Sequence, residues 1–349
     1  MNRKLACTVI ALPLLAGCES TPTEVPLTVR ATVSTAATVT PLDISGGIDG
    51  GPGGRTVSRD GVILGEVSRL RSWWQSSASP PNILDSGFVN GGNRNADAAG
   101  GQAEVILSTN GGPPWVSLEL QVPAGTAARN VYASDMNDSR VVVGRTGGTY
   151  NAALRWPSPT SAPEKLPMPP VQYPVYLVHA RAVNNPGVIV GYVLEILPKN
   201  KQRYEAIIWS GNVASILPRP AGVTSQLASN INDAGVISGI ADGIHPIRWI
   251  PRAGGGYDIA VASIDVGATN LDTAIDACGR IGGGSDSGAW IWEGATVRLL
   301  PAIAGAGLWG VVRDLNESGT AVGASTQRFA KKNARIQHAT AWTGLGPCP

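Results

Sequence analysis

The sequence is poor in the residues that most enzymes and metal proteins rely on. Its 349 residues include three histidines and two phenylalanines. So few histidines leave little material for a metal site, and we predict neither a metal nor another cofactor. The sequence also has no Gly-x-Ser-x-Gly elbow and no kinase signature. Its glycine-rich strings lack the strand-to-helix setting of a phosphate-binding loop. Motifs therefore assign no catalytic residue.

An excess of charge of one sign is also missing. The chain has 27 basic and 25 acidic residues, and the first 17 residues include Arg3 and Lys4 but no acidic residue. Without that segment, the chain is formally neutral. Nucleic-acid binding depends largely on basic residues that neutralise phosphates. We therefore expect no nucleic-acid partner.

The N-terminus has the pattern of an export signal. A basic start precedes an apolar run, Leu5–Leu14, which is shorter than the roughly 20 residues that span a bilayer. The string Leu15-Ala16-Gly17-Cys18 that follows resembles the lipobox of bacterial lipoproteins. This resemblance implies cleavage before Cys18, acylation of its thiol with fatty acids such as palmitate, and anchoring in the lipid bilayer of the envelope. Glu19 resembles an outer-membrane sorting signal if the cell is Gram-negative.

Three segments follow from this pattern. Residues 1–17 are the signal peptide, 18–40 are the lipidated cysteine and a linker, and 41–349 are the main domain. Cys7 leaves with the signal and Cys18 carries lipid. Cys278 and Cys348 then remain in an oxidising compartment, where we expect them to form a disulfide.

Composition predicts an all-β chain. Forty-four glycines and ten tryptophans accompany many Val, Thr and Pro residues, which is typical of short strands joined by tight turns. After the signal, no long stretch has apolar residues at a helical period.

A repeat of about 45 residues is the most informative feature. Its copies share a turn, typically with Asn and Gly, that is followed by an apolar strand: Arg59–Gly65, Met136–Gly144, Val183–Gly191, Ile231–Gly239, Ile275–Gly283 and Leu315–Gly323. Asp276 stands in place of the Asn in one copy, and Arg140 in place of the Gly in another. A tryptophan follows each copy: Trp74, Trp156, Trp209, Trp249, Trp292 and Trp342. A gap of 79 residues between Gly65 and Gly144 indicates one further, degraded copy at Asn95–Gly101, with Trp115.

Each unit reads as four short antiparallel strands. In one unit Tyr204–Trp209 is the third strand, Ser210–Asn212 a turn, and Val213–Pro218 the fourth strand. Such units predict a β-propeller, most consistent with seven four-stranded blades, with six or eight as alternatives. The last unit lacks a fourth strand. We expect 25–33 or 39–44 to supply it and close the ring.

The repeat resembles the HAF repeat of bacterial extracellular proteins. The Asn–Gly turn matches, and His338-Ala339-Thr340-Ala341-Trp342 keeps the His-Ala and Trp positions. His245 and Trp249 match in another copy. The resemblance covers about residues 55–344 and implies an exported repeat protein, but it supplies no catalytic residues.

Repeated residues are expected to be structural. One tryptophan per unit is typical of a core position, and His245 with His338 shares one repeat position. Trp73 and Trp290 each neighbour a repeat tryptophan, so one of each pair could face solvent. No nucleophile pairs with His179 in the sequence. Asp135, Asn230 and Asp314 share a place two residues before the turn Asn, where they either line a channel or hydrogen-bond to its strands.

Irregular segments are the better candidates for a partner. Trp309 is expected in a loop, and two basic inserts, 194–203 and 328–335, precede the third strand of their units. The residues proposed to contact a partner are Trp309, Lys199, Lys201, Arg203, Arg328, Lys331, Lys332 and Arg335.

Three functions follow. The first is a non-catalytic, monomeric propeller that binds an envelope protein or polysaccharide. The second is a lyase or hydrolase that acts on a sugar or small ligand at the channel mouth, and the third is a purely structural envelope protein. A cluster of His, Asp, Glu or Arg that breaks the repeat on one face would point to a discrete site.

Overall fold

The computed structural model describes residues 32–33, 37–42, 53–67, 70–148, 151–262, 272–303, 306–328 and 335–348. Cys18, Lys331 and Lys332 lie outside these residues, as do the side chains of Arg328 and Arg335. In the described part, helical structure is limited to short 3-10 turns such as η1 (Ala128–Asn130) and η3 (Pro198–Asn200). No helix there is long and apolar enough to cross a membrane.

Five sheets each contain four antiparallel strands in order. The first contains β3 (Gly53–Val57), β4 (Ile63–Val67), β5 (Leu70–Trp74) and β6 (Asn82–Ser86). The second contains β7 (Val89–Gly92), β8 (Ala98–Gly100), β9 (Glu104–Ser108) and β10 (Trp115–Glu119). The third contains β11 (Val131–Met136), β12 (Val142–Thr146), β13 (Ala153–Trp156) and β14 (Glu164–Lys165). The fourth contains β15 (Val175–Val183), β16 (Ile189–Leu197), β17 (Lys201–Ser210) and β18 (Val213–Ile216). The fifth contains β19 (Gln226–Ile231), β20 (Ile237–Ala241), β21 (His245–Pro251) and β22 (Tyr257–Val261).

A nine-stranded sheet completes the ring. One set of four contains β23 (Ala274–Ile275), β24 (Ile281–Ser285), β25 (Gly288–Glu293) and β26 (Thr296–Leu299). The other contains β27 (Ala306–Leu315), β28 (Ala321–Arg328), β29 (Arg335–Thr343) and the N-terminal β2 (Thr38–Pro41). β1 (Thr32–Val33) lies parallel to β26, and β24 also pairs with β27. Because that pairing merges the two sets into one sheet, the count of seven blades stays a prediction.

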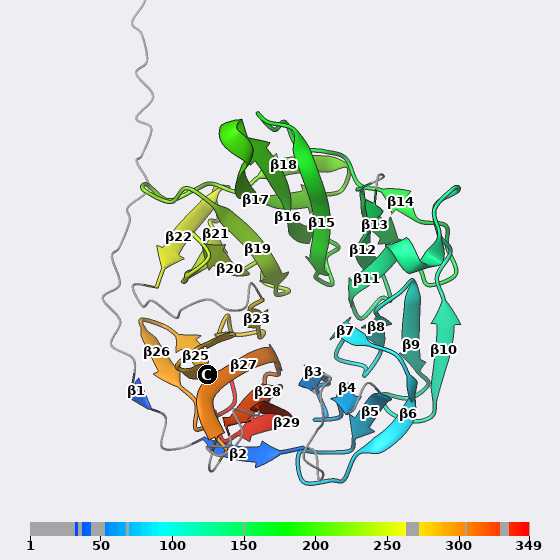
Figure 1. Ribbon diagram of the computed structural model, residues 1–349, viewed down its shortest axis with the longest axis vertical. Coiled ribbons are helices and arrows are strands. Elements are labelled where there is room, and N and C mark those ends of the chain that lie inside the picture. The colour runs from blue at the N-terminus through cyan, green and yellow to red at the C-terminus, as the bar shows by residue number, and fades with distance from the viewer. Residues whose placement is uncertain are drawn as a thin grey trace, which may run out of the picture.

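The sheets stand around a common centre with one strand of each set innermost (Figure 1). This arrangement is a β-propeller, so the predicted all-β propeller fold is confirmed. The strand beside β29 is Thr38–Pro41, which overlaps the second of the two segments expected to close the ring. It begins before residue 41, where the sequence placed the domain boundary.

The repeated tryptophans fill the core between neighbouring sheets. Six of them are 0% exposed: Trp74, Trp156, Trp209, Trp249, Trp292 and Trp342. Five of them donate their indole N–H to a backbone carbonyl of the preceding set of four strands. The acceptor lies just after the outermost strand of that set, as Pro167 does for Trp209 at 2.7 Å. The structural interpretation of these residues is therefore confirmed.

Four sequence expectations need correction. Trp290 is 1% exposed, so neither member of the Trp290–Trp292 pair faces solvent. Trp309 lies in strand β27 rather than in a loop. The repeat asparagine of the degraded copy is Asn93, because its side chain caps the turn to Asp97 as the other asparagines do. Trp115 lies in the fourth strand, where it packs on half-buried Trp73 at 5.0 Å between ring centroids.

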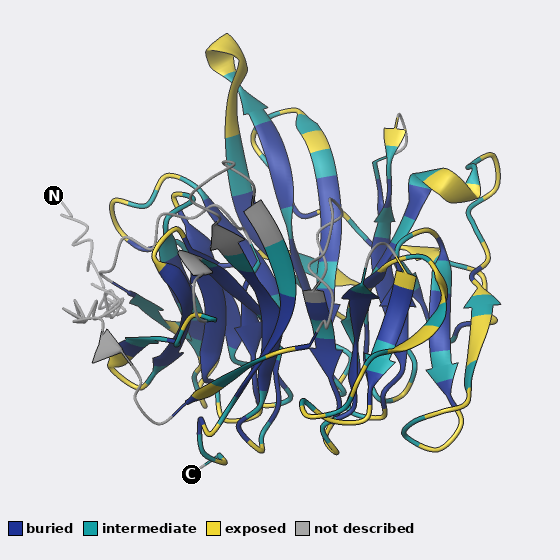
Figure 2. Ribbon diagram, turned by 60° about the horizontal axis from the view of Figure 1, so that its bottom comes forward, coloured by how far each residue is buried: buried dark blue, intermediate teal, exposed yellow. Residues whose placement is uncertain are grey.

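The insert 194–203 is not irregular. It extends β16 and β17 into a hairpin that projects beyond the neighbouring strands (Figure 2). Glu195 and Glu205 are buried within this hairpin and both pair with Arg203, at 2.7 and 2.9 Å. The extension is therefore held by buried charges that satisfy one another.

Candidate functional site: the central channel

The turn asparagines form a belt around the centre of the ring. Each side-chain amide donates to the backbone carbonyl at the equivalent turn of the next unit, as Asn137 does to Asn184 at 2.9 Å. The same bond leaves Asn93, Asn184, Asn232 and Asn316. Asp276 cannot donate, and the guanidinium of Arg280 reaches Asn316 O at 3.5 Å instead. The belt explains why the repeat demands Asn.

Charged side chains cross the channel at the turn end, just beyond this belt. Arg94, in the turn after β7, pairs with Asp233, in the turn after β19, at 2.9 Å. The amide of Asn185 bridges the carboxylates of Asp233 and Asp138, at 2.9 and 2.8 Å. These four side chains link turns from separate sheets and narrow that end of the channel.

A layer of carboxylates lies on the other side of the belt. Asp135 accepts the backbone N–H of Val183 at 3.0 Å. Asp314 accepts the backbone N–H of Val57 and the side-chain hydroxyl of Thr56, each at 2.8 Å. Burial is the main cause that raises the pKa of Asp135 to about 7 and that of Asp314 to about 6. Both line the channel while bonding to an adjacent inner strand, so the two roles considered for this position apply together.

The innermost strands contain β-bulges that turn further side chains inward. Pairing with the second strand shifts at Arg55, Ser134, Arg181, Ser229 and Arg313. A bulge inserts one residue and re-aims its side chain. The repeat glycine opposite makes room for it, since a Cβ at Gly191 would collide with the carbonyl oxygen of His179. All five bulge residues line one cavity of about 180 Å³.

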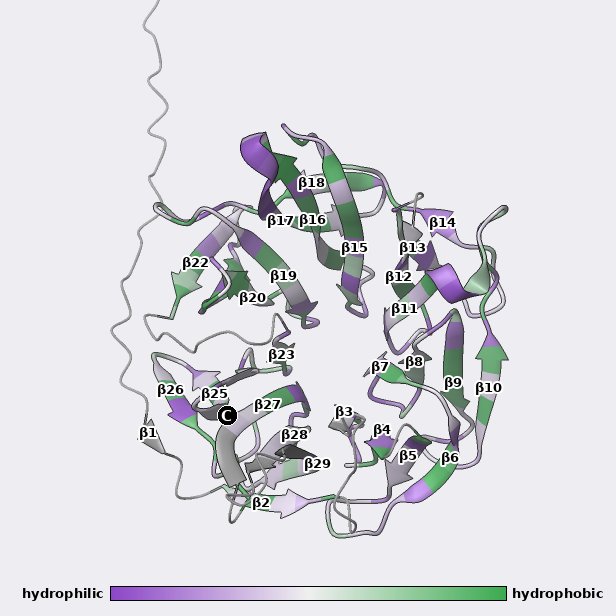
Figure 3. Ribbon diagram, in the orientation of Figure 1, coloured by the Kyte–Doolittle hydropathy of each residue, from purple (hydrophilic) through white to green (hydrophobic). Residues whose placement is uncertain are grey.

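These bulge residues differ between units, unlike the belt. Three are arginines, and Asp272 adds a carboxylate opposite Arg181, with which it forms an ion pair. Hydrophilic residues accordingly mark the channel-facing ends of β19 and β27 (Figure 3). The cluster that breaks the repeat is therefore present, in the channel rather than in the inserts.

His179 has a nucleophile partner, contrary to its sequence interpretation. Its Nε2 lies 2.8 Å from the hydroxyl of Ser134, and its Nδ1 lies 3.2 Å from the hydroxyl of Tyr192. Burial, together with Arg181 and Arg145, lowers the pKa of His179 well below its ordinary value. The imidazole is thus neutral at pH 7.

The residues with described side chains among those predicted to contact a partner lie in two places, the β16–β17 hairpin and strand β27. Lys199 and Lys201 are exposed at the tip of the β16–β17 hairpin, whereas Arg203 is neutralised at its base. Trp309 is half-buried in β27. Sequence reasoning missed Arg55, Arg181 and Arg313, although each stands three residues before the first turn residue of its repeat.

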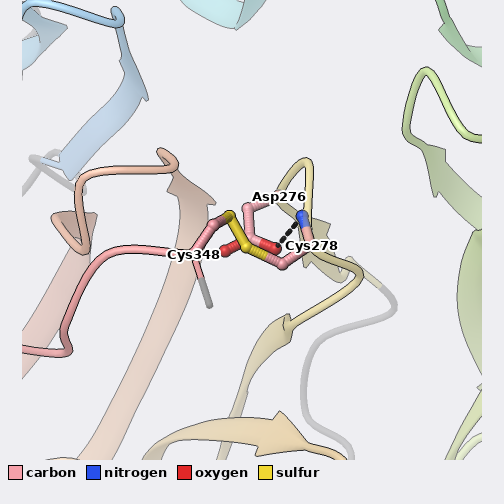
Figure 4. Close-up of side chains that lie close together, drawn as sticks. All are labelled: Asp276, Cys278 and Cys348. Carbon is pink, nitrogen blue, oxygen red and sulfur yellow. Dashed lines mark hydrogen bonds between the residues drawn. A yellow bond between two sulfur atoms is a disulfide. The ribbon is translucent and has the colours of Figure 1, made fainter.

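The two late cysteines join the β23–β24 turn to the segment that follows β29. Cys278 and Cys348 form a disulfide with Cα atoms 5.6 Å apart (Figure 4), within the usual range. With Asp276 they form one group close enough for metal ligands among the described residues. Asp276 instead pairs with Arg280 at 2.6 Å, and the sulfurs are bonded to each other, so these atoms are already used.

The comparisons with known proteins support the class of fold. No protein-family model matches the chain, and no curated protein sequence matches it. Solved structures do resemble it: "YCF48 bound to D1 peptide" has a TM-score of 0.52 at 10% identity, covering 90% of this chain and 97% of that chain. The extracellular domain of a putative one component system from B. thetaiotaomicron has a TM-score of 0.50 at 8% identity, covering 88% of this chain and 40% of that chain. A gluconolactonase from Xanthomonas campestris has a TM-score of 0.44 at 11% identity, covering 90% of each chain. At these identities the likeness is one of fold: the chain is similar to β-propellers.

Proposed function

We propose that the protein is an exported, lipid-anchored binding propeller that holds its ligand in the central channel. One observation carries this proposal: the belt and core positions repeat around the ring, whereas the bulge residues vary and include three arginines that line the cavity. Function lies in particular sites rather than in the fold itself, and these side chains distinguish one part of the channel from another. The export signal and the lipobox-like string before Cys18 support attachment to the envelope.

The ligand proposed is an envelope protein segment or polysaccharide that carries negative charge. Arg55, Arg181 and Arg313 line the cavity, and guanidinium groups bind carboxylates with paired N–H donors. A propeller of similar fold has been described bound to a peptide, which is compatible with a protein ligand here.

A pull-down tests this proposal. The chain from Ser20 onward, which keeps every described residue, is incubated with separated envelope proteins and polysaccharides at low and moderate salt. We expect one component to be retained. Arg313→Gln should abolish its retention, and Lys199→Gln with Lys201→Gln serves as the matched variant outside the channel. If only the lysine variant fails to retain the component, the binding surface is the hairpin and not the channel. If the wild-type protein retains no component at either salt concentration, the binding function is rejected.

A hydrolase is the second candidate, favoured by the contact between Ser134 and His179. A neutral imidazole 2.8 Å from a hydroxyl is positioned to accept its proton, and Tyr192 orients the ring through Nδ1, which is the arrangement of an activated nucleophile. Ser134 Oγ would bond to the carbonyl carbon of an ester, and His179 would pass the proton to the leaving alcohol. Water would then release the acid and restore Ser134.

Labelling with a fluorophosphonate probe tests the hydrolase. Covalent labelling of Ser134 that is lost in Ser134→Ala and strongly reduced in His179→Gln would support it. Ser76→Ala changes an exposed serine and serves as the control. A protein that binds its envelope component but is never labelled would leave binding as the function.

A further inference from the structure

The strongest unused feature of the channel is the guanidinium of Arg313. This inference rests on the proposed function, because it concerns a subsite of the same cavity. Arg313 stands at the bulge of β27, and Arg55 stands at the bulge of β3, on the neighbouring inner strand. Their positive charges act on each other, since Arg55 is one of the causes that lower the pKa of Arg313 to about 9, after the larger effect of burial.

The two arginines leave buried donors without acceptors. Nη1 of Arg313 and Nε of Arg55 are both buried and have no hydrogen-bond partner. A buried N–H without an acceptor costs about 1–3 kcal/mol, and more when the group is charged. Most buried polar groups in folded proteins are paired, so two unpaired donors lining one cavity indicate that an acceptor belongs there.

The nearby carboxylates are already committed to other arginines. Asp272 pairs with Arg181, and Glu66 lies 3.4 Å from Arg55 while accepting the backbone N–H of Val89 at 2.9 Å. Within the described residues, no carboxylate lies within ion-pair distance of Arg313. Asp314, its neighbour in sequence, bonds to the backbone of β3 instead. Among the described residues, Arg313 therefore carries a positive charge that has no ion-pair partner, although Asp272 and Glu66 lie near enough to act on it.

The positive charge of Arg313 and the two unpaired N–H donors, Nη1 of Arg313 and Nε of Arg55, determine which chemical group the subsite binds. We propose that Arg313 and Arg55 form a subsite for a carboxylate. One carboxylate oxygen accepts a hydrogen bond from Arg313, and the other accepts one from Arg55. A carboxylate carries a single negative charge and offers two acceptor oxygens. A phosphate dianion would bring a second negative charge near Asp272 and Glu66. The subsite thus selects ligands that present a carboxylate to the channel.

Calorimetric titration with small probes tests this subsite. D-glucuronate is the probe, and D-glucose, which lacks the carboxylate, is its matched control, with acetate and inorganic phosphate as further probes. We expect glucuronate and acetate to bind and glucose not to bind, with phosphate at least tenfold weaker than acetate. Arg313→Gln and Arg55→Gln should each weaken acetate binding at least tenfold. Arg155→Gln, which changes a pair outside the channel, should have no effect.

The outcomes separate the subsite from the proposed function. Circular dichroism establishes that each variant is folded, and Arg313→Lys, which keeps the charge but loses the fork, should bind with intermediate affinity. If acetate and glucuronate fail to bind, or bind equally well to Arg313→Gln, the carboxylate subsite is wrong. An envelope component that is still retained by Arg313→Gln would preserve the binding function without this subsite. If phosphate binds more tightly than acetate, the subsite is one for a dianion and not for a carboxylate.

Discussion

The side-chain amide of Asn184 donates to the backbone carbonyl of Asn232 at 3.0 Å, and its Oδ1 accepts the N–H of Val188 at 2.8 Å. One side chain therefore shapes its own turn and ties that turn to the next. Equivalent residues do the same around the channel. The belt therefore links neighbouring sheets whose turns are far apart in sequence.

Replacing Asn184 with alanine should destabilise the fold. Both bonds are lost: the N–H of Val188 loses its acceptor, and the carbonyl of Asn232 keeps only the N–H of Gly235. We therefore expect a loss of about 1–3 kcal/mol in the free energy of unfolding. Urea unfolding followed by tryptophan fluorescence measures it. Asn212→Ala, in an exposed turn, is the control and should change little. Equal stability of the two variants would show that the belt is dispensable.

Asp135 should make stability depend on pH. Its folded pKa of about 7 lies above the ordinary 3.8, so the folded state binds more protons between these values. The stability contributed by the protonated group is fully present below pH 3.8 and is lost as the pH rises through 7. Asp135→Asn keeps an acceptor for Val183 without the charge.

We therefore expect Asp135→Asn to be more stable than the wild type at pH 8, by on the order of 1–3 kcal/mol, with the difference shrinking towards pH 4. Urea midpoints across this range measure the difference. Asp258→Asn, at an exposed position, controls for the loss of one surface carboxylate. A difference that does not change with pH would contradict the raised pKa.

Reducing the disulfide should weaken the whole ring. Cys278 and Cys348 are 70 residues apart in sequence, and a cross-link of this span contributes about 2–5 kcal/mol. Wild-type protein should lose that amount of unfolding free energy in dithiothreitol. Cys278→Ser should show the same loss without reductant and no further change with it. Insensitivity of the wild type to reductant would mean that the bond contributes nothing.

Cys18 should carry the membrane anchor. In cells supplied with an alkyne-tagged palmitate, the wild-type protein should be labelled and recovered with membranes, because two or more acyl chains give stable anchoring. Cys18→Ser should be unlabelled and absent from the membrane fraction, whereas Cys278→Ser should behave as wild type. Labelling that survives in Cys18→Ser would reject the lipobox interpretation.

The fold was predictable because its determinants recur at a fixed spacing. Residues equivalent to Trp209 and Asn184 occur in nearly every unit. Each equivalent tryptophan packs in the same way, and each equivalent asparagine forms the same hydrogen bonds. The degraded copy was misaligned by two residues because Ala96 adopts the left-handed conformation (φ 60°) that glycine usually marks. Without that glycine, the predicted copy begins at Asn95 instead of Asn93.

The site escaped sequence analysis for the opposite reason. Bulge residues differ from unit to unit, so a search for repetition passes over Arg313 and Ser134. Arg181 and Asp272 pair across 91 residues, a separation that no local pattern reveals. Ser134 and His179 are 45 residues apart, about one repeat length, and such spacing places residues at similar heights on adjacent inner strands. Aligning the units on their turn asparagines would have placed Ser134, Arg181 and Arg313 in one column, three residues before the asparagine.

The pairing of β2 with β29 also sets the order in which the molecule can be completed. Thr38–Pro41 emerges during synthesis long before its partner, Arg335–Thr343. Until then β2 lacks its partner strand, and unpaired strand edges invite association between chains. Pairing over such a sequence distance is also slow to form. The early part of the chain must therefore avoid aggregation until β29 arrives, and termination before β29 would leave the sheet with an unpaired edge strand.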